Sequence, residues 1–291
     1  MRETIHLPYR PMEGRPVMRL PGGARVAVMF LLAIEEWPLD QPIPRGAITP
    51  PAGGPGPVPD IPNWAWHEYG MRVGFGRIKS LLDRLGIRAT VALNASVGTS
   101  YPELMKAMVD AGWEMVAHGY VQRPLTREAD ERAVIRKTRD AIRALTGKAP
   151  RGWIGPGMAE TWESAHILAE EGFEYVCDWM LDDQPQELPV RAGRLAALPY
   201  TLELNDVVTF AVQHQPGPEW VRRVRAQLDT LYAEGEASAR IMPIGVHPYL
   251  MGVPHRISLL AESLEYVAGH GGVVFWTGEE ILDWYRRGAC A

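Results

Sequence analysis

The stretch VAVMFLLAIEE, residues 26–36, is the part of the chain that decides the fold. Its apolar part, Val26–Ile34, is typical of a buried strand, and two carboxylates, Glu35 and Glu36, follow where that strand ends. The apolar run argues against a merely solvated pair of glutamates. Because adjacent carboxylates repel each other, we expect one of them to have a raised pKa unless a cation neutralises the pair. A raised pKa suits a general base that activates water.

Two further apolar runs end at a histidine. His118 follows Glu114–Ala117, and His247 follows Ile241–Val246. A lone histidine in such a place is more often a core residue satisfied by the backbone, but two at matching strand ends favour a site. In α/β proteins with parallel strands, sites form at the carboxyl ends of the strands. We therefore expect these residues to converge on one pocket, with side-chain atoms of Glu35 or Glu36 within about 6 Å of His118 and of His247. An enzyme is the leading hypothesis.

A unit of amphipathic helix, glycine and short apolar strand recurs along the chain. Glycine suits the residue after a helix because that residue commonly adopts a positive φ. Strands that alternate with helices imply a parallel sheet, and this many units predict an α/β barrel. The helical faces, glycines and strands are Ile78–Leu85, Gly86 and Ala89–Asn94; Leu104–Val109, Gly112 and Glu114–His118; Val134–Leu145, Gly147 and Gly152–Gly155; Ile167–Leu168, Gly172 and Tyr175–Asp178; and Leu259–Val267, Gly271-Gly272 and Val273–Trp276.

The chain of 291 residues shows no hinge or break in composition, so we predict one catalytic barrel domain over residues 25–291, preceded by an extended arm over residues 1–24. The formal net charge of −5, with lysines and arginines scattered among acids, argues against nucleic acid as a partner. No apolar run reaches the roughly 18 residues of a membrane span, and the N-terminus lacks the apolar region of a signal peptide. Cys177, in an apolar run, and Cys290, at the tail, fit a reducing cytoplasm. We expect Cys177 to be a small buried hydrophobe rather than a nucleophile.

Residues 37–62 interrupt the repeat with nine prolines and four glycines. A linker here would separate the first strand from its own sheet, so we expect a semi-rigid active-site loop that lies over the strand ends. The stretch NWAWHEYG, residues 63–70, follows the loop. Two interpretations of its rings stay open: they wall a pocket for a flat or ring-shaped ligand, or they pack the loop down.

Other polar residues also lie near predicted strand ends. They are Asp178, Asp182 and Asp183 after the strand that begins at Tyr175, Arg151 and Trp153 at another strand, and Asn205-Asp206 after Leu198-Pro199-Tyr200. For Arg151, orientation of a substrate carbonyl or carboxylate and a surface ion pair are equally open. Six histidines without a comparable setting are predicted to be surface residues, namely His6, His67, His166, His214, His255 and His270.

The order of these landmarks resembles the polysaccharide deacetylase (NodB-homology) family, and within it the allantoinase-like (PuuE-type) branch. The matching motifs are Ile34-Glu35-Glu36-Trp37, Ala117-His118-Gly119-Tyr120-Val121-Gln122, Pro150-Arg151-Gly152-Trp153-Ile154-Gly155-Pro156, Asp182-Asp183 and Val246-His247-Pro248-Tyr249. The allantoinase-like branch is matched by residues 62–70 and 198–206. The resemblance covers the chain from about residue 25 to residue 276 and implies an irregular (β/α) barrel of about seven units.

The chain departs from the metal-dependent members at the metal position. The family's second acid and its two histidines correspond here to Glu36, His118 and Gln122. A neutral amide oxygen is a poor zinc ligand beside imidazole or carboxylate, and glutamate for aspartate extends the reach by one methylene. The allantoinase-like branch, which shows similar substitutions, is thought to work without metal. We therefore expect no cofactor; if zinc or another divalent metal is present, these three residues would hold it.

The resemblance implies a cytoplasmic hydrolase that opens or cleaves a non-peptide C–N bond in a small cyclic amide, imide or ureide. Glu35 takes the family's general-base position and His247 its general-acid position. Glu36 is expected to position hydrogen-bond donors and to tune the pKa of Glu35. The oxyanion then needs other donors, such as His118, Gln122 or backbone N–H groups. The residues expected to bind substrate are Trp64, Trp66, Gln122, Arg151, Trp153, Asp183 and Tyr200. Two alternatives remain, a divalent-metal-dependent N-deacetylase of an amino sugar or related amide, and an inactive relative that binds a small molecule.

We also expect a homo-oligomer, a tetramer as in related cytoplasmic members. The arm residues His6–Met18 contain apolar and aromatic side chains but have no place in the barrel repeat. Such an arm is stable only when it buries that surface against something, and we expect it to cross to a neighbouring surface.

Overall fold

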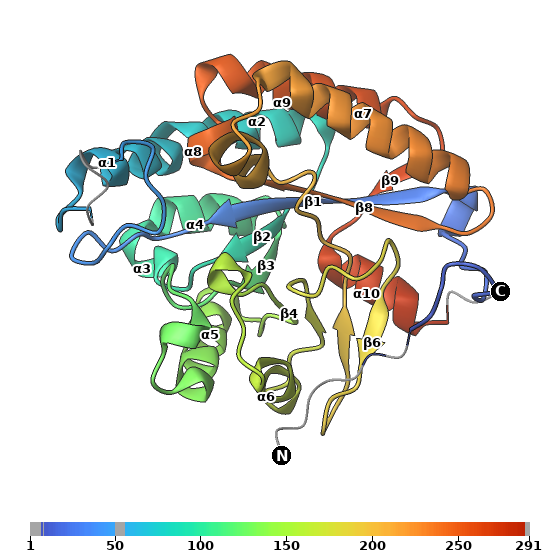
Figure 1. The fold of residues 1–291 in the computed structure, drawn as a ribbon, viewed down its shortest axis with the longest axis horizontal. Helices are drawn as coiled ribbons and strands as arrows, with labels where there is room; N and C mark the ends of the chain where they lie inside the picture. Colours follow the sequence, from blue (N-terminus) through green and yellow to red (C-terminus); the bar gives the residue numbers. More distant parts are fainter. Residues whose placement is uncertain (1–6, 8, 50–55, 289–291) are drawn as a thin grey trace.

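The computed structural model describes residues 7, 9–49 and 56–288 and contains one curled sheet (Figure 1). The strand order is β6-β7-β5-β4-β3-β2-β1-β8, and β9 pairs with β1 beside β2. All pairings are parallel except β6 with β7. The strands are β1 (Val26–Ile34), β2 (Thr90–Leu93), β3 (Glu114–Ala117), β4 (Gly152–Trp153), β5 (Tyr175–Val176), β6 (Gln186–Leu188), β7 (Leu195–Ala197), β8 (Arg240–Val246) and β9 (Val273–Phe275).

Single contacts rather than a full ladder bring the far edge of the sheet round to β8. Asn205 forms an isolated parallel bridge with Gly245, and the N–H of Ile241 donates to the carbonyl of Asp183 at 2.9 Å. The sheet therefore curls into an irregular (β/α) barrel, which confirms the predicted fold class.

Helices cover the outside of the barrel, and α2, α7 and α9 lie over β1 and β8 in Figure 1. The longer helices are α1 (Ile61–Tyr69), α2 (Phe75–Leu85), α4 (Pro102–Asp110), α5 (Glu131–Thr146), α6 (Ser164–Glu170), α7 (Gly217–Glu234), α9 (Pro254–Ala268) and α10 (Gly278–Arg286). Short turns α3 (Val97–Ser100) and α8 (Pro248–Met251) follow β2 and β8, and a π-helical turn, Gly70–Gly74, joins α1 to α2. The predicted stop at Gly86 is confirmed, since this residue ends α2 with φ 66°.

Alternation along the strands divides the core into two layers. In β1, Val28, Phe30 and Leu32 pack toward the helices, whereas Met29 and Leu31 pack inside the barrel. Because side chains alternate across a strand, Glu35 continues the inner series and Glu36 the outer one. The same parity places His118 and His247 inside the barrel, because Val116 and Ile241 belong to the inner layer.

The amino ends of the strands are closed by α10 and by the N-terminal arm. The N–H of Gly278, at the start of α10, donates to Thr90 in the first position of β2 at 2.9 Å. Met18 and Leu20 are buried in the inner layer, and Met18 accepts from the N–H of Ala239 at 2.9 Å. The expectation that the whole arm crosses to a neighbouring surface is therefore wrong for this part, which packs on its own barrel. His6 and Cys290 lie outside the described residues.

Within the part of the chain that the structure describes, we find no helix with the length and apolar character needed to cross a membrane.

Candidate active site

Three polar side chains from three strand ends meet inside the barrel. Nε2 of His118 lies 3.6 Å from Oε1 of Glu35, and Nε2 of His247 lies 3.5 Å from the same oxygen. Register explains the meeting: Ile34, Leu93 and Ala117 are level across β1, β2 and β3, so the residues after them are level too. All three side chains are nearly excluded from solvent. These distances confirm the predicted convergence.

The carboxylate of Glu35 is held by donors on both oxygens. Nε2 of Gln122 donates to Oε1 at 3.0 Å, and Nε1 of Trp37 donates to Oε2 at 2.7 Å. Burial by itself would raise the pKa of Glu35, but the two imidazoles that face it, His118 and His247, hold this pKa well below its usual range. Glu35 is therefore ionised at neutral pH.

The expected raised pKa within the glutamate pair is wrong for Glu35, and strand parity supplies the reason. The two carboxylates do not face each other, because Glu36 turns to the other side and its Oε1 accepts from Oγ of Ser100 at 2.7 Å. The N–H of Glu36 is also used, since it donates to Oδ1 of Asn94 at 2.8 Å. Glu36 is thus placed to shape the end of β1 rather than to repel Glu35.

His247 is fixed by Asp206, a fully buried carboxylate. Nδ1 of His247 lies 2.6 Å from Oδ1 of Asp206, and the main-chain N–H of His247 donates to Oδ2 at 2.7 Å. Burial lowers the pKa of His247, but Asp206 and Glu35 outweigh burial and raise the pKa to about 9. Asp206 stood out in the sequence only as a polar residue after an apolar stretch, and nothing there indicated its pairing with His247.

His118 presents a bare ring nitrogen to Glu35. Its Nδ1 lies 2.7 Å from the carbonyl oxygen of Ile154, which accepts hydrogen bonds only, so Nδ1 carries a hydrogen. Nε2 of His118 is buried and has no hydrogen-bond partner among the described residues. In neutral His118 this atom has a lone pair directed at the reacting region.

These groups line a cavity of about 80 Å³ at the carboxyl ends of the strands. Pro44 and Arg45 of the 37–62 loop line it, so the described part of this loop lies over the strand ends, as predicted. Tyr200 and Gln122 also line the cavity, in agreement with their predicted place in the pocket. The remaining wall includes Leu31, Ala33, Ala92, Ile154, Gly155, Gly157, Met158, Asn205, Val207, Val208 and Tyr249.

The aromatic stretch after the loop forms α1 and packs instead of lining this cavity. Nε1 of Trp64 donates to the carbonyl of Trp37 at 3.1 Å, and the ring of Trp66 packs edge-on to Tyr249 with centroids 4.9 Å apart. Of the two open interpretations, packing of the loop is correct and the pocket wall is wrong for Trp64 and Trp66. These rings hold the loop against α8.

Two histidines predicted to be surface residues are buried. The ring of His67 stacks on Trp37 with centroids 4.3 Å apart, and burial is the main cause that lowers the pKa of His67 to about 4. His166 is buried in α6 and its Nδ1 accepts from the N–H of Arg191 at 3.1 Å. A sequence pattern cannot show such burial when the histidine is not at a strand end. Cys177, by contrast, is fully buried with a pKa raised by burial, as expected of a structural cysteine.

Trp153 and Asp183 do not reach the cavity. Trp153 is fully buried on the helix side of the sheet against Phe173, and the adjacent Ile154 faces the cavity instead. These two residues are adjacent in the chain, so their side chains point to opposite faces of the sheet. Asp183 lies beside the start of β8, where its carbonyl accepts from Ile241, at the opposite end of that strand from His247. The predicted substrate contacts of Trp153 and Asp183 are therefore wrong.

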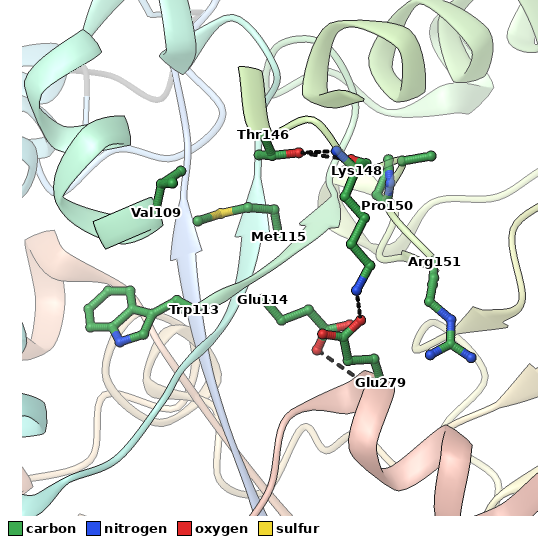
Figure 2. A pocket seen from close by; sticks show the side chains of 10 residues that line it. Val109, Trp113, Glu114, Met115, Thr146, Lys148, Pro150, Arg151 and Glu279 are labelled. Atoms are coloured by element: carbon green, nitrogen blue, oxygen red, sulfur yellow. Dashed lines mark hydrogen bonds and ion pairs between the residues drawn. The ribbon is translucent and has the colours of Figure 1, made fainter. Parts of the chain in front are cut away.

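Arg151 lies at the amino end of β4, away from the cavity. It is one wall of a separate pocket of about 160 Å³ that also includes Glu114 and Glu279, and Figure 2 shows these residues together. Its guanidinium is bound to Glu174 at 2.7 Å and to Asp283 at 2.8 Å. Of the two open interpretations, the ion pair is correct, and orientation of a substrate in the strand-end cavity is wrong.

The donors at the family's metal position do not fit a tightly held cation. Nε2 of Gln122 donates to Glu35, and Oε1 of Gln122 accepts from Nδ2 of Asn94 at 3.3 Å. A flipped amide would place its oxygen against the Glu35 carboxylate, so an N–H faces the reacting region. His118 Nε2 and Glu36 Oε2 have no partner, but a third ligand atom is missing. Among the described residues, no three or more His, Cys, Asp or Glu side chains are grouped to hold a metal.

The chain is similar to known polysaccharide deacetylases and to an allantoinase. Residues 67–176 match the family model described as Polysaccharide deacetylase. A peptidoglycan deacetylase of Helicobacter pylori is 26% identical over 249 residues, which are 72% of this chain and 83% of that protein. The structure is similar to that of a probable polysaccharide deacetylase from Pseudomonas aeruginosa PAO1, with a TM-score of 0.85 and 29% identity over 94% of this chain and 95% of the other. It is also similar to Puue allantoinase, with a TM-score of 0.83 and 27% identity over 97% and 98% of the two chains. The resemblance predicted from the motifs is confirmed.

Proposed function

We propose that this chain, a hydrolase acting on carbon–nitrogen bonds other than peptide bonds, opens or cleaves that bond in a small cyclic amide, imide or ureide. One observation carries the proposal: an ionised Glu35 lies 3.5 Å from a His247 whose raised pKa keeps it protonated. A base and an acid, each in its reactive protonation state at neutral pH, face one reacting region. The likeness to an allantoinase and a small cavity covered by a loop support the substrate class.

In the first step of the proposed reaction, Glu35 takes a proton from water as the water oxygen attacks the substrate carbonyl. Nε2 of His118 accepts the second hydrogen of the same water and orients it. The carbonyl π-electrons move to oxygen, giving a tetrahedral oxyanion. Ion pairing lowers the basicity of Glu35, but it also fixes the carboxylate in one position, which favours proton transfer in a preorganised site.

In the second step, His247 gives its Nε2 proton to the ring nitrogen as the C–N bond breaks. Asp206 remains on Nδ1 throughout, where it orients the ring and stabilises its charged form. The released nitrogen leaves as a neutral amine or amide, and the carbonyl carbon becomes a carboxylic acid. The proton taken up by Glu35 then returns the pair to its starting charge.

For the oxyanion we propose two donors that the cavity already contains. Tyr200 accepts from Nδ2 of Asn205 at 2.9 Å, and Oδ1 of Asn205 is occupied by the N–H of Val207, so the amide cannot turn. The hydroxyl of Tyr200 therefore directs its own hydrogen elsewhere, and burial raises the pKa of Tyr200, which keeps that hydrogen in place. The second amide hydrogen of Gln122 is the other donor.

A second candidate function is divalent-metal-dependent N-deacetylation of an amino sugar or related amide. The deacetylase relatives favour it, and so does a cleft of about 820 Å³ next to the cavity. Met158 lines both spaces, and the cleft also contains Trp162 and Trp179, whose rings suit a sugar. The third hypothesis, an inactive protein that binds a small molecule, predicts binding without turnover.

Turnover on two substrate groups, measured with metal-free protein and again with added divalent metal, separates these functions. One group contains hydantoins, cyclic imides and cyclic ureides, and the other contains N-acetylglucosamine and its oligomers. The proposal requires hydrolysis of a ring compound, measured as new carboxylate. Release of acetate from the second group alone would replace it with the deacetylase function. If compounds of neither group are hydrolysed, the inactive binding protein is favoured.

We retain homo-oligomerisation as a proposal for the arm. Tyr9 is 90% exposed and Met12 is 50% exposed, so these apolar side chains are not covered by their own barrel. A second copy of the chain would cover them in a homo-oligomer, for which we propose a tetramer. Light scattering at micromolar concentration would show a multiple of the 32.4 kDa chain, and a monomer would refute the proposal.

A further inference from the structure

Arg45 brings a positive charge from the 37–62 loop to the catalytic cavity. It lines the cavity beside Pro44, and its charge acts on the buried phenol of Tyr249, where it works against the burial that raises the pKa of that hydroxyl. Among the residues that the structure describes, the guanidinium of Arg45 has no salt bridge. Its Nη1 atom is buried and has no hydrogen-bond partner there.

Several other partly buried arginines are paired with a carboxylate, and Arg77 and Arg256, which are not, donate to the carbonyls of Gly252 and Leu250. Arg240 is bound to Glu234 at 2.9 Å, and Arg286 is bound to Glu174. An unpaired buried N–H of a charged group carries a substantial desolvation cost. Such a group is therefore expected where a bound ligand supplies the missing acceptor. Arg45 is also one of the residues that line the space that the substrate must enter.

We infer that Arg45 binds a planar oxygen acceptor of the substrate, either a carboxylate or the second carbonyl of an imide or ureide ring. The inference rests on the proposed function, because it assigns a specificity residue to that same cavity. A guanidinium presents N–H groups in a fixed plane, which matches two coplanar oxygens better than an ammonium does. The acceptor lies on the part of the substrate that points to the loop, away from the carbonyl attacked at Glu35.

The charges around the cavity make this acceptor the fitting occupant. Glu35 and Asp206 share the one positive charge of the protonated His247, and Arg45 supplies a second positive charge at the cavity. A basic substrate group would meet Arg45 as a like charge. An apolar group would leave the buried Nη1 atom without a partner. An oxygen acceptor satisfies that atom and fixes which end of the ring lies against Glu35.

The kinetic test compares Arg45→Gln and Arg45→Lys on the ring compound that the wild-type chain hydrolyses best. We expect Arg45→Gln to raise KM about 10- to 100-fold, the usual effect of losing a hydrogen bond to a charged group, with a smaller change in kcat. If the acceptor is a carboxylate, Arg45→Lys keeps part of the affinity because the charge remains. If it is a ring carbonyl, Arg45→Gln keeps more, because a neutral amide still donates. Arg84→Gln is the matched control, since Arg84 is exposed and paired with Glu265 on the outer helices.

A binding experiment separates failure of this inference from failure of the proposed function. The full chain carrying Glu35→Gln is titrated calorimetrically with N-carbamoylglycine, a carboxylate probe, and with succinimide, a carbonyl probe. Binding of either probe that is lost when Arg45→Gln is added supports the inference, even if no substrate is turned over. Equal affinity with and without Arg45, or no binding of both probes, overturns it. Turnover of a ring compound with unchanged KM in Arg45→Gln would overturn the inference and leave the proposed function standing.

Discussion

Asp206 forms two hydrogen bonds with His247, with Oδ1 2.6 Å from the ring Nδ1 and Oδ2 2.7 Å from the main-chain nitrogen. One fully buried carboxylate thus fixes both the ring and the backbone where β8 ends. The result is a histidine whose pKa is raised to about 9 and whose Nε2 points at Glu35. The protonation state of the proposed acid is therefore set by a residue that does not touch the substrate.

Asp206→Asn should lower the pKa of His247, because the amide removes the negative charge that outweighs burial. The alkaline limb of kcat/KM should then move below pH 9. The folded-state pKa of about 9 lies above the ordinary value of 6.5, so this pair contributes stability that is complete below pH 6.5 and lost as pH rises through 9. Breaking a buried pair costs about 3–5 kcal/mol. Thermal unfolding should show this loss at pH 6 and a smaller loss at pH 10; equal losses at both would contradict the pairing.

Glu35→Gln should lower kcat by roughly 10²–10⁴-fold with little change in substrate affinity. The amide keeps the size of the side chain and one acceptor, but it cannot take a proton from water. Glu36→Gln is the control, because Glu36 faces Ser100 on the other side of the strand and should cost less. A larger loss from Glu36→Gln would mean that the two roles are exchanged.

Protein prepared without added metal should contain far less than one zinc per chain. The reason is Gln122, whose N–H rather than its oxygen faces Glu35. Gln122→His combined with Glu36→Asp should raise the zinc affinity, measured by titration. Stoichiometric zinc in the native protein, together with loss of activity on chelation, would favour the metal-dependent reaction instead. An unchanged affinity in the double variant would show that these ligands were not what limited zinc binding.

The π-helical turn Gly70–Gly74 packs against α8, the helical turn that directly follows His247, and this contact can be tested. A Cβ at Gly74 would lie 2.3 Å from the carbonyl oxygen of Pro248 in α8, whereas a Cβ at Gly76 would meet nothing within 4 Å. Gly74→Ala should therefore destabilise the fold by about 1–3 kcal/mol or more and lower kcat through displacement of α8. Gly76→Ala should stabilise α2 by about 0.5–1 kcal/mol. Chemical denaturation of both variants checks the contrast, and similar stabilities would refute this close contact.

Much of the barrel and its reacting centre follows from the sequence. An apolar run predicts a strand, and period-two alternation decides that Glu35, His118 and His247 share the inner face. The short strands β4 and β5 were predicted too long, because only two residues of each are paired with their neighbours. The antiparallel β6–β7 hairpin and the long helix α7 were not predicted, since they stand outside the helix–glycine–strand repeat.

The side-chain partners could not be predicted from local pattern. Arg151 and Trp153 matched a family motif, yet one is held by Glu174 at the amino end of β4 and the other faces the helices. Asp206 and Arg45 entered the site only through long-range placement, one beside β8 and the other on a loop. Such contacts depend on how distant segments pack, which composition and spacing do not encode.

The pH profile of kcat/KM on the best ring substrate tests the central claim most directly. The claim requires ionised Glu35, with a pKa well below its usual range, and protonated His247, with a pKa of about 9. We therefore predict a rate that is level from pH 6 to 8 and falls above about pH 9, as His247 loses its proton. A rate that instead rises about tenfold per pH unit between pH 6 and 8 would mean that a neutral histidine acts as the base, and it would contradict the account.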